Sequence, residues 1–450
     1  MTAPRQWTDE QLGKAVAVIL NHVDGLWWAY YDVDLASGAQ GAPRIADVLA
    51  RIERTALGYR WSGTADEERA LLSVLLHVLG DEPAAAREIF RRIFDINQLP
   101  ADSGADAGLA GKLNRAERRW REQRFLADVR AGRCENRPIL VAEGDSWFQF
   151  PGFTLFKLGR ARIHLEFVRE IIDHLIGSGR YCVRSIAAGG DWLSSMLRTE
   201  DYIEPLSRIE PDAFLFSGGG NDLLAEGRVA NMVRHKRRLS EPEEFTRHAA
   251  DLVKHRCAHG RGGGPPLDET KYALGAKFLS KDFVSFMNLA LVQYYLFFSS
   301  LTHSKLHTMA IITQGYDYPI PTRVSTAPWY SLRRWVNREL GSGKWLWMPL
   351  EQKRLDDDEK RAVAYALITE FNELLIALAR SGQFPRLYHV DLRGVARSGG
   401  DWYDEIHLTS EAFGRAAAVY QRCLDDVLSR NPSGHKVFHA AGGEGPLAPA

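Results

Sequence analysis

Five short apolar segments alternate with helical segments across the central part of the chain. The expected strands are 138–142, 181–186, 213–217, 308–313 and 386–390, and the expected helices include 167–177, 283–300 and 357–380. Strands that are apolar along their whole length are buried on both faces, and strand–helix alternation is typical of a parallel sheet covered by helices. The sequence therefore predicts an α/β domain whose chemistry lies at the carboxyl ends of the strands.

The segments on either side of this domain have a different character. Residues 1–132 are predicted to form a helical region, with stripes at 12–23, 45–52, 71–76 and about 82–96, the first after the capping-box pattern Thr8-Asp9-Glu10-Gln11. The α/β domain occupies 133–430 and carries insertions at about 225–281 and 322–350. Residues 431–450 are rich in Gly, Ala and Pro, and we expect a disordered tail there.

The composition is that of an ordinary globular protein without a strong net charge. The 57 basic and 57 acidic residues give no argument for nucleic-acid binding, and 45% hydrophobic residues are ample for a large core. Charged residues near the N-terminus argue against a secretory signal. The charge-free stretch 283–301 is interpreted as a buried core helix rather than a membrane span. We therefore expect a cytoplasmic protein, with export by a signal-independent machine left open.

The four cysteines lie far apart in the sequence, at Cys134, Cys182, Cys257 and Cys423. They form no C-x-x-C pair, and no histidine cluster lies at zinc-binding spacing. We interpret them as free thiols in a reducing compartment.

Two segments contain the parts of an activated serine nucleophile. The first predicted strand ends in Glu143-Gly144-Asp145-Ser146-Trp147, and a serine at a sharp turn after a strand has an exposed hydroxyl. Far along the chain, Asp404 and His407 are spaced so that the carboxylate can bond the imidazole. Taken alone, Ser146 could be a turn former, and Asp404 with His407 could be a helix cap beside a surface histidine.

Two glycine-rich segments follow the second and third predicted strands. Gly189-Gly190 allows the backbone to approach a substrate closely, although an ordinary tight loop would look the same. Gly218-Gly219-Gly220 precedes Asn221, whose side-chain amide can donate a hydrogen bond to a developing oxyanion. The alternative for Asn221 is a turn or cap former.

Taken together and in this order, the four segments resemble the four blocks of the SGNH (GDSL-type) hydrolase superfamily, which are GDS, a glycine, GxND and DxxH. The resemblance covers roughly residues 137–430 and does not reach the N-terminal helices. Trp147 replaces the leucine of the nominal GDSL motif, at a position that we do not expect to carry chemistry. No asparagine precedes the second-block glycine, so Gly189 competes with Gly190 for that role.

The resemblance implies a fold and a set of catalytic roles. The fold would be a flavodoxin-like three-layer α/β/α sandwich with a parallel sheet. Ser146 would be the nucleophile, and Asp404 and His407 would complete the triad. The backbone N–H groups of Ser146 and Gly190, with the amide of Asn221, would form the oxyanion hole.

The implied activity is hydrolysis of a carboxylic ester through an acyl-serine intermediate, as in an esterase or lipase. Such a reaction requires an acyl-ester substrate and no metal or organic cofactor. One alternative is a non-catalytic binding or regulatory protein on the hydrolase scaffold. Another is a lipase or esterase effector that is delivered into another cell.

The insertion at 322–350 and the N-terminal helices have no role in this chemistry. The insertion concentrates Trp329, Trp335, Trp345 and Trp347 among basic residues, which suits contact with a membrane interface. A folded subdomain that buries its own tryptophans is the favoured alternative. The N-terminal helices are interpreted as an interaction or shielding module whose protein partner is unknown.

Overall fold

The computed structural model describes the residues around the candidate site and most of the central domain. The described residues are 7–21, 52–55, 58–61, 85, 88–89, 92, 108–150, 153–158, 161–165, 168–239, 266–302, 306–323 and 343–440. The chain divides into two compact units. The smaller comprises Met1–Ala101, Val284–Thr308 and Ala377–Leu387, and the larger comprises Asp102–Phe283, Met309–Ile376 and Tyr388–Ala450.

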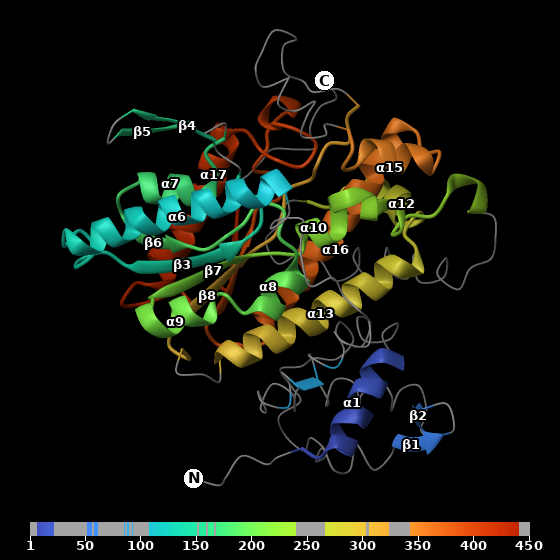
Figure 1. The fold of residues 1–450 in the computed structure, drawn as a ribbon. Coiled ribbons are helices and arrows are strands. Elements are labelled where there is room, and N and C mark those ends of the chain that lie inside the picture. Colours follow the sequence, from blue (N-terminus) through green and yellow to red (C-terminus); the bar gives the residue numbers. More distant parts are fainter. Residues whose placement is uncertain are drawn as a thin grey trace. The chain divides into compact units, whose positions relative to one another are not determined.

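A six-stranded parallel sheet forms the centre of the larger unit (Figure 1). Its strands, in spatial order, are β10 (Val437–His439), β9 (Leu387–Asp391), β8 (Ala310–Gln314), β7 (Ala213–Ser217), β3 (Ile139–Gly144) and β6 (Cys182–Ser185). Every residue of β7 and β8 is buried, because helices cover both faces of the sheet. The predicted α/β class and the five predicted strands are confirmed.

The order of the strands places a crevice beside β3. This strand lies between β6 and β7, with Leu140 opposite Val183 on one side and Ala213 on the other. The chain therefore leaves β3 toward one side of the sheet and later returns to its other side. Loops that leave the carboxyl ends of neighbouring strands diverge at such a point, and ligands of open α/β sheets bind there.

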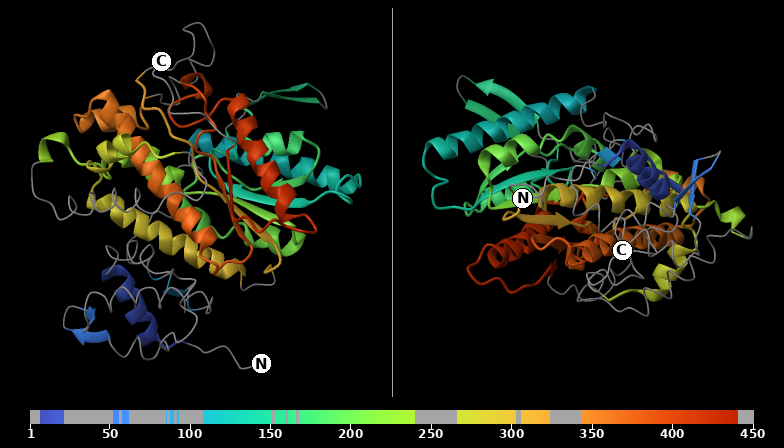
Figure 2. Two further views of the ribbon diagram at one scale, coloured as in Figure 1. Left: turned by 180° about the vertical axis from the view of Figure 1, so that it is seen from behind. Right: turned by 90° about the horizontal axis from the view of Figure 1, so that it is seen from below.

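Helices of very different length connect the strands. Those of the larger unit are α6 (Gly108–Arg130), α7 (Ile171–Gly177), α8 (Leu193–Thr199), α9 (Ile203–Ile209), α10 (Gly220–Leu224), α12 (Glu269–Ala276), α15 (Trp347–Gln352), α17 (Ser410–Val427) and most of α16 (Asp357–Arg380), with the 3₁₀ turns η2 (Ala225–Ala230), η3 (Lys236–Arg238) and η4 (Gly399–Asp401). Figure 1 shows α6 and α7 on one face of the sheet and α9 on the other. The helices α16 and α17 are best seen from behind (Figure 2).

Among the described residues, two helices are long and apolar enough to cross a membrane, namely α13 (Lys281–Thr302) and α16. Within the most apolar stretch of each, 78% of α13 and 89% of α16 is buried inside the protein. Core helices of globular proteins have this pattern, so length and composition here are weak evidence for a membrane span. This burial agrees with the interpretation of 283–301 as a core helix.

The N-terminal region is helical only in part. Helix α1 (Asp9–Asn21) begins at the predicted capping box, where Thr8 N donates to Gln11 Oε1 at 2.9 Å and Gln11 N donates to Thr8 Oγ1 at 3.3 Å. The helical stripe predicted at 45–52 is wrong at its end, because β1 (Ile52–Thr55) pairs with β2 (Gly58–Trp61) in an antiparallel hairpin. The β-branched Ile52 and Thr55 and the aromatic Tyr59 and Trp61 are residue types that favour strands. Residues 85, 88, 89 and 92 are helical as predicted, whereas 64–76 lie outside the described residues.

The prediction of four free thiols is wrong for two of them. Cys134, just after α6, and Cys182, at the start of β6, form a disulfide, and Cys423 is free and buried. Cys257 lies outside the described residues. Disulfides persist mainly in oxidising compartments, so this pairing does not support the expected reducing environment.

Three further strands, β10 and the two strands of a separate hairpin, were absent from the sequence prediction. β10 lies within the stretch 431–450 that was expected to be a disordered tail, and it pairs with β9 through Val437 opposite His389. A contact with a residue far away in the sequence holds this strand at the sheet edge, because His439 Nδ1 lies 2.9 Å from the buried Asp391 carboxylate. A separate hairpin joins β4 (Phe153–Leu158) to β5 (Ala161–Leu165).

The two predicted insertions are described only in part. The described residues of 225–281 form η2, η3 and α12, and the Gly/Pro tract at 260–265 lies outside them. In the insertion at 322–350, Trp329 and Trp335 lie outside the described residues. The ring of Trp347 lies 4.6 Å from Lys360 Nζ and 5.4 Å from the Arg323 guanidinium.

Candidate functional site

Ser146 lies on a tight turn at the carboxyl end of β3. A Cβ atom at Gly144 would lie 2.8 Å from Ser217 Cβ, so only glycine lets the strand end lie this close to β7. Asp145 then closes the turn, because its carbonyl accepts from the N–H groups of Phe148 and Gln149, each at 3.0 Å. The predicted strand-to-helix turn is thus a single turn, and no long helix follows it.

The turn and the Asp404–His407 loop bring three predicted catalytic side chains together. His407 Nε2 lies 2.7 Å from Ser146 Oγ, and His407 Nδ1 lies 2.7 Å from Asp404 Oδ2. Ser146 is 8% exposed and His407 is 7% exposed, and the ring of Phe150 packs edge-on against the imidazole. Both ring nitrogens are therefore engaged, one toward a hydroxyl and the other toward a carboxylate.

The Asp404 carboxylate is held in an ionised form by its surroundings. Burial opposes its ionisation, but the neighbouring His407 and three hydrogen bonds outweigh burial and lower the pKa of Asp404 below its ordinary value. The second oxygen accepts from the backbone N–H groups of Ile406 at 2.9 Å and His407 at 2.8 Å. The loop then enters α17, where Thr409 caps the helix by accepting from Ala412 N. The pair therefore lies on a loop that is followed directly by a helix.

Two of the three predicted oxyanion donors, Gly190 and Asn221, lie on segments that are bonded to each other. Asn221 Nδ2 donates to the carbonyl of Asp191 at 2.8 Å, and Asp222 accepts from Leu193 N at 2.7 Å. These bonds fix the loop that contains Gly190, which has a left-handed φ of 85°. Burial raises the pKa of Asp222 to about 6. Asn221 therefore orients the Gly190 loop and also lines a cavity together with Ser146.

Helix α6, which lies wholly outside the span of the family resemblance, supports the same loops. Asn114 Nδ2 donates to the carbonyl of Gly189 at 2.9 Å, and Arg118 Nε donates to the carbonyl of Ala187 at 3.1 Å. The buried Arg121 donates to the carbonyl of Phe148 at 2.8 Å, and it is balanced by Glu117, Glu170 and Asp173. No pattern in the sequence indicated that this charged helix faces the site.

A buried hydrogen-bond network lies behind Ser146. Asp145 accepts from Tyr316 Oη at 2.5 Å and from Ser217 Oγ at 3.0 Å, and burial raises the pKa of Asp145 to about 6. Ser217 in turn accepts from Gln314 at 2.7 Å. Tyr316 Oη also accepts from Gly220 N at 3.0 Å, so the network joins the ends of β3, β7 and β8. Single polar residues at strand ends gave no signal in the sequence.

Two residues inside the motifs have roles that the sequence did not indicate. Trp147, which was expected to carry no chemistry, donates from Nε1 to the carbonyl of Ile406 at 3.2 Å and so ties the nucleophile turn to the His407 loop. Glu405 is fully buried, and its carboxylate accepts from four backbone N–H groups. These belong to Thr322, Trp345, Leu346 and Trp347.

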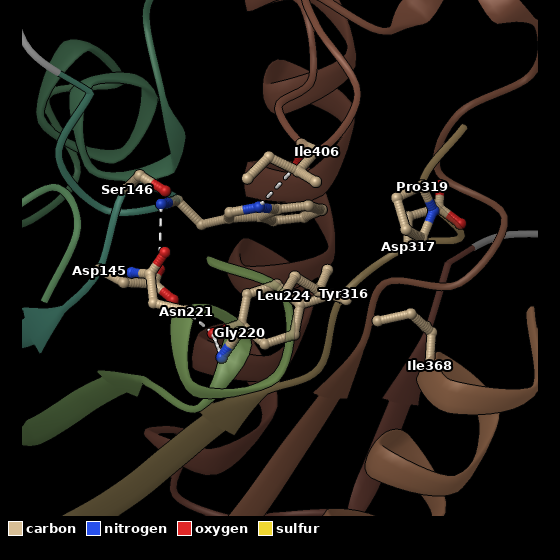
Figure 3. Close-up of a pocket in the computed structure, with 11 residues that line it drawn as sticks. Asp145, Ser146, Gly220, Asn221, Leu224, Tyr316, Asp317, Pro319, Ile368 and Ile406 are labelled. Atoms are coloured by element: carbon tan, nitrogen blue, oxygen red, sulfur yellow. Dashed lines mark hydrogen bonds between the residues drawn. The ribbon is translucent and has the colours of Figure 1, made fainter. Parts of the chain in front are cut away.

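A small cavity opens beside Ser146 (Figure 3). Its lining residues are Asp145, Ser146, Trp147, Gly220, Asn221, Leu224, Tyr316, Asp317, Pro319, Ile368 and Ile406. Figure 3 shows Ser146 and Ile368 on opposite sides of this cavity. A substrate bound at Ser146 would therefore have an apolar recess next to its reacting carbon.

Neither metal ligation nor similarity to known proteins identifies the site. Within the described part of the chain, no group of three or more His, Cys, Asp or Glu side chains could hold a metal ion. Comparison of the chain with protein-family models, with curated proteins and with solved structures finds no match. The chemistry of the site is therefore inferred from its own residues.

Proposed function

We propose that the protein is a serine hydrolase that cleaves a carboxylic ester through an acyl-serine intermediate. The observation that carries the proposal is the continuous chain from Ser146 Oγ to His407 and on to Asp404, with both distances at 2.7 Å. A hydroxyl, a base and an orienting carboxylate at hydrogen-bond distance are the parts needed to activate a serine. Since these residues are up to 261 positions apart in sequence, chance local structure does not explain the arrangement.

The reaction follows from these contacts. His407 Nε2 accepts the Ser146 proton as Oγ attacks the acyl carbon, and Asp404 stabilises the imidazolium that results. The oxyanion is held by the N–H groups of Ser146 and Gly190 and by the Asn221 amide. His407 then gives its proton to the departing alcohol, which leaves an acyl-serine. Water attacks the acyl-serine while His407 again accepts a proton. His407 returns this proton to Ser146 Oγ, and the carboxylic acid leaves the site.

Membership of the SGNH hydrolase superfamily is part of the proposal. The four motif segments occur in the family's order, and the asparagine of the GxND segment is bonded to the loop of the second segment. When β3 is counted as the first strand, the order β6-β3-β7-β8-β9 reads 2-1-3-4-5, which is the flavodoxin-like order. β10 would then be an addition at the edge. This order supports a flavodoxin-like three-layer sandwich.

The direct test is hydrolysis of nitrophenyl acetate by the wild-type protein and by Ser146→Ala. The wild type should turn over and the variant should lose at least a thousandfold in kcat, with an unchanged circular dichroism spectrum. Ser207→Ala, which changes an exposed serine on α9, is the matched control and should behave as the wild type. Undiminished turnover by Ser146→Ala would rule out the proposed nucleophile.

A further inference from the structure

The cavity beside Ser146 is small and its walls are apolar. The whole depression, with its open mouth, measures about 310 Å³, but the centre of a water molecule can lie in only about 20 Å³ of it. A cavity can hold one water molecule when the volume open to the centre of that molecule is about 10–15 Å³. The recess therefore has room for a group about the size of one or two water molecules. The buried apolar members of its wall are Trp147, Leu224, Pro319, Ile368 and Ile406.

The two acidic residues in the wall are engaged by protein donors. Asp145 accepts from Ser217, Tyr316 and the N–H of Trp147. Asp317 accepts from the N–H groups of Tyr318 at 2.8 Å, Gly394 at 2.8 Å and Ala396 at 2.6 Å. Because these contacts occupy the carboxylates, a bound group would meet mainly carbon at this wall. A hydroxylated or charged acyl group would lose its hydrogen bonds to water there and would gain none from this wall.

The walls of the recess are held in place by packing and hydrogen bonds. Ile368 lies on the long helix α16 and is fully buried, and Ile406 is held through its carbonyl by the indole N–H of Trp147. The Trp147 ring is itself packed edge-on against Tyr316 and Phe413, with ring centres 5.3 and 5.4 Å apart. Long acyl chains would have to displace these packed groups.

We propose that this recess is the acyl-binding pocket and that it selects short, unbranched acyl groups of the acetyl class. The inference rests on the proposed hydrolase function and specifies its substrate. The methyl group of an acetyl ester would enter between Trp147 and Leu224 while its carbonyl carbon lies at Ser146. Ile368, on the far side, would set the upper limit on chain length.

The test is a series of nitrophenyl esters with acetyl, butanoyl and octanoyl groups. The wild type should prefer acetate, and kcat/KM should fall by tenfold or more for each methylene that the pocket cannot accommodate. Ile368→Ala frees the volume of about three carbon atoms and should raise the butanoate-to-acetate ratio of kcat/KM by at least tenfold. Ile376→Ala truncates another buried isoleucine of α16 that does not line the recess, and it should leave the ratio unchanged.

The outcomes separate this inference from the proposed function. A wild type that cleaves octanoate as well as acetate, or an Ile368→Ala variant with an unchanged ratio, overturns the pocket while the hydrolase function stands. A wild type that cleaves none of the three esters overturns the hydrolase function itself. If Ile368→Ala does not fold, Ile368→Val removes one methyl group and should shift the ratio in the same direction by a smaller factor.

Discussion

Glu405 gives the sharpest prediction about how the catalytic loop is held. Its Oε1 accepts from Thr322 N at 3.1 Å and Trp347 N at 2.7 Å, and its Oε2 accepts from Trp345 N at 3.1 Å and Leu346 N at 3.2 Å. In Glu405→Gln an NH₂ group replaces one of these oxygens. Two backbone N–H donors, which are buried or partly buried, then lose their acceptor, whichever way the amide is turned. At about 1–3 kcal/mol for each donor, the variant should be destabilised by about 2–6 kcal/mol at neutral pH.

The pH dependence of this loss has a defined sign. Burial raises the pKa of Glu405 from its ordinary 4.5 to about 7, so the folded protein keeps a proton that the unfolded chain releases between these values. The unfolding free energy of the wild type therefore falls as the pH rises from 4.5 to 7, by about 3 kcal/mol from this group. The variant lacks this titration. Its stability deficit should thus be greatest near pH 4.5, should shrink toward pH 7 and should be constant above pH 8.

Denaturant unfolding of both proteins between pH 4.5 and 8.5 measures this difference. A deficit that does not change with pH would refute the assignment of the titration to Glu405. The same variant should lower kcat for nitrophenyl acetate by ten- to a hundredfold, because Glu405 lies between Asp404 and His407 and small misplacements of catalytic groups are costly. Glu351→Gln removes the carboxylate bonded to Lys360, outside the catalytic loop, and should leave kcat unchanged.

Three further substitutions test single contacts at the site. Asp404→Asn should lower kcat by about ten-thousandfold with little loss of stability, as measured by steady-state kinetics and thermal unfolding. Trp147→Phe replaces the indole by a smaller aromatic ring without an N–H and leaves the Ile406 carbonyl without this donor. It should destabilise the protein by about 1–3 kcal/mol and lower kcat, and equal stability would contradict the contact. Gly220→Ala would place a Cβ 2.6 Å from Tyr316 Cζ, and denaturant unfolding should show a loss of about 1–3 kcal/mol.

Local patterns in the sequence predicted what depends on neighbouring residues. The apolar run before Gly144 and the run before Gly218 gave the central strands, because fully buried parallel strands are uniformly apolar. Ser146, Asp404 and His407 were identified because each lies in a short motif. The predicted strand ends already placed these residues at one edge of the sheet. Only the folded structure shows that His407 lies 2.7 Å from both Ser146 Oγ and Asp404 Oδ2.

Contacts between distant residues could not be predicted in this way. The disulfide joins Cys134 and Cys182 across 48 residues, and no spacing rule identifies such a pair. Glu405 is an ordinary acid in the sequence, since its four donors lie 58 to 83 residues earlier. β10 has only three residues, all partly buried, so neither its length nor its apolar content distinguished it from a tail.

The role of Ser146 as the nucleophile can be measured directly by trapping the intermediate. The protein should be mixed with nitrophenyl acetate, quenched in acid within the first turnovers and digested for peptide mass spectrometry. We expect one acetyl group on Ser146 in the wild type and none on the peptide that contains position 146 in Ser146→Ala. His407→Ala should greatly slow its formation. Rapid turnover of the ester with no acetyl group on Ser146, or with the acetyl group on another residue, would contradict the account.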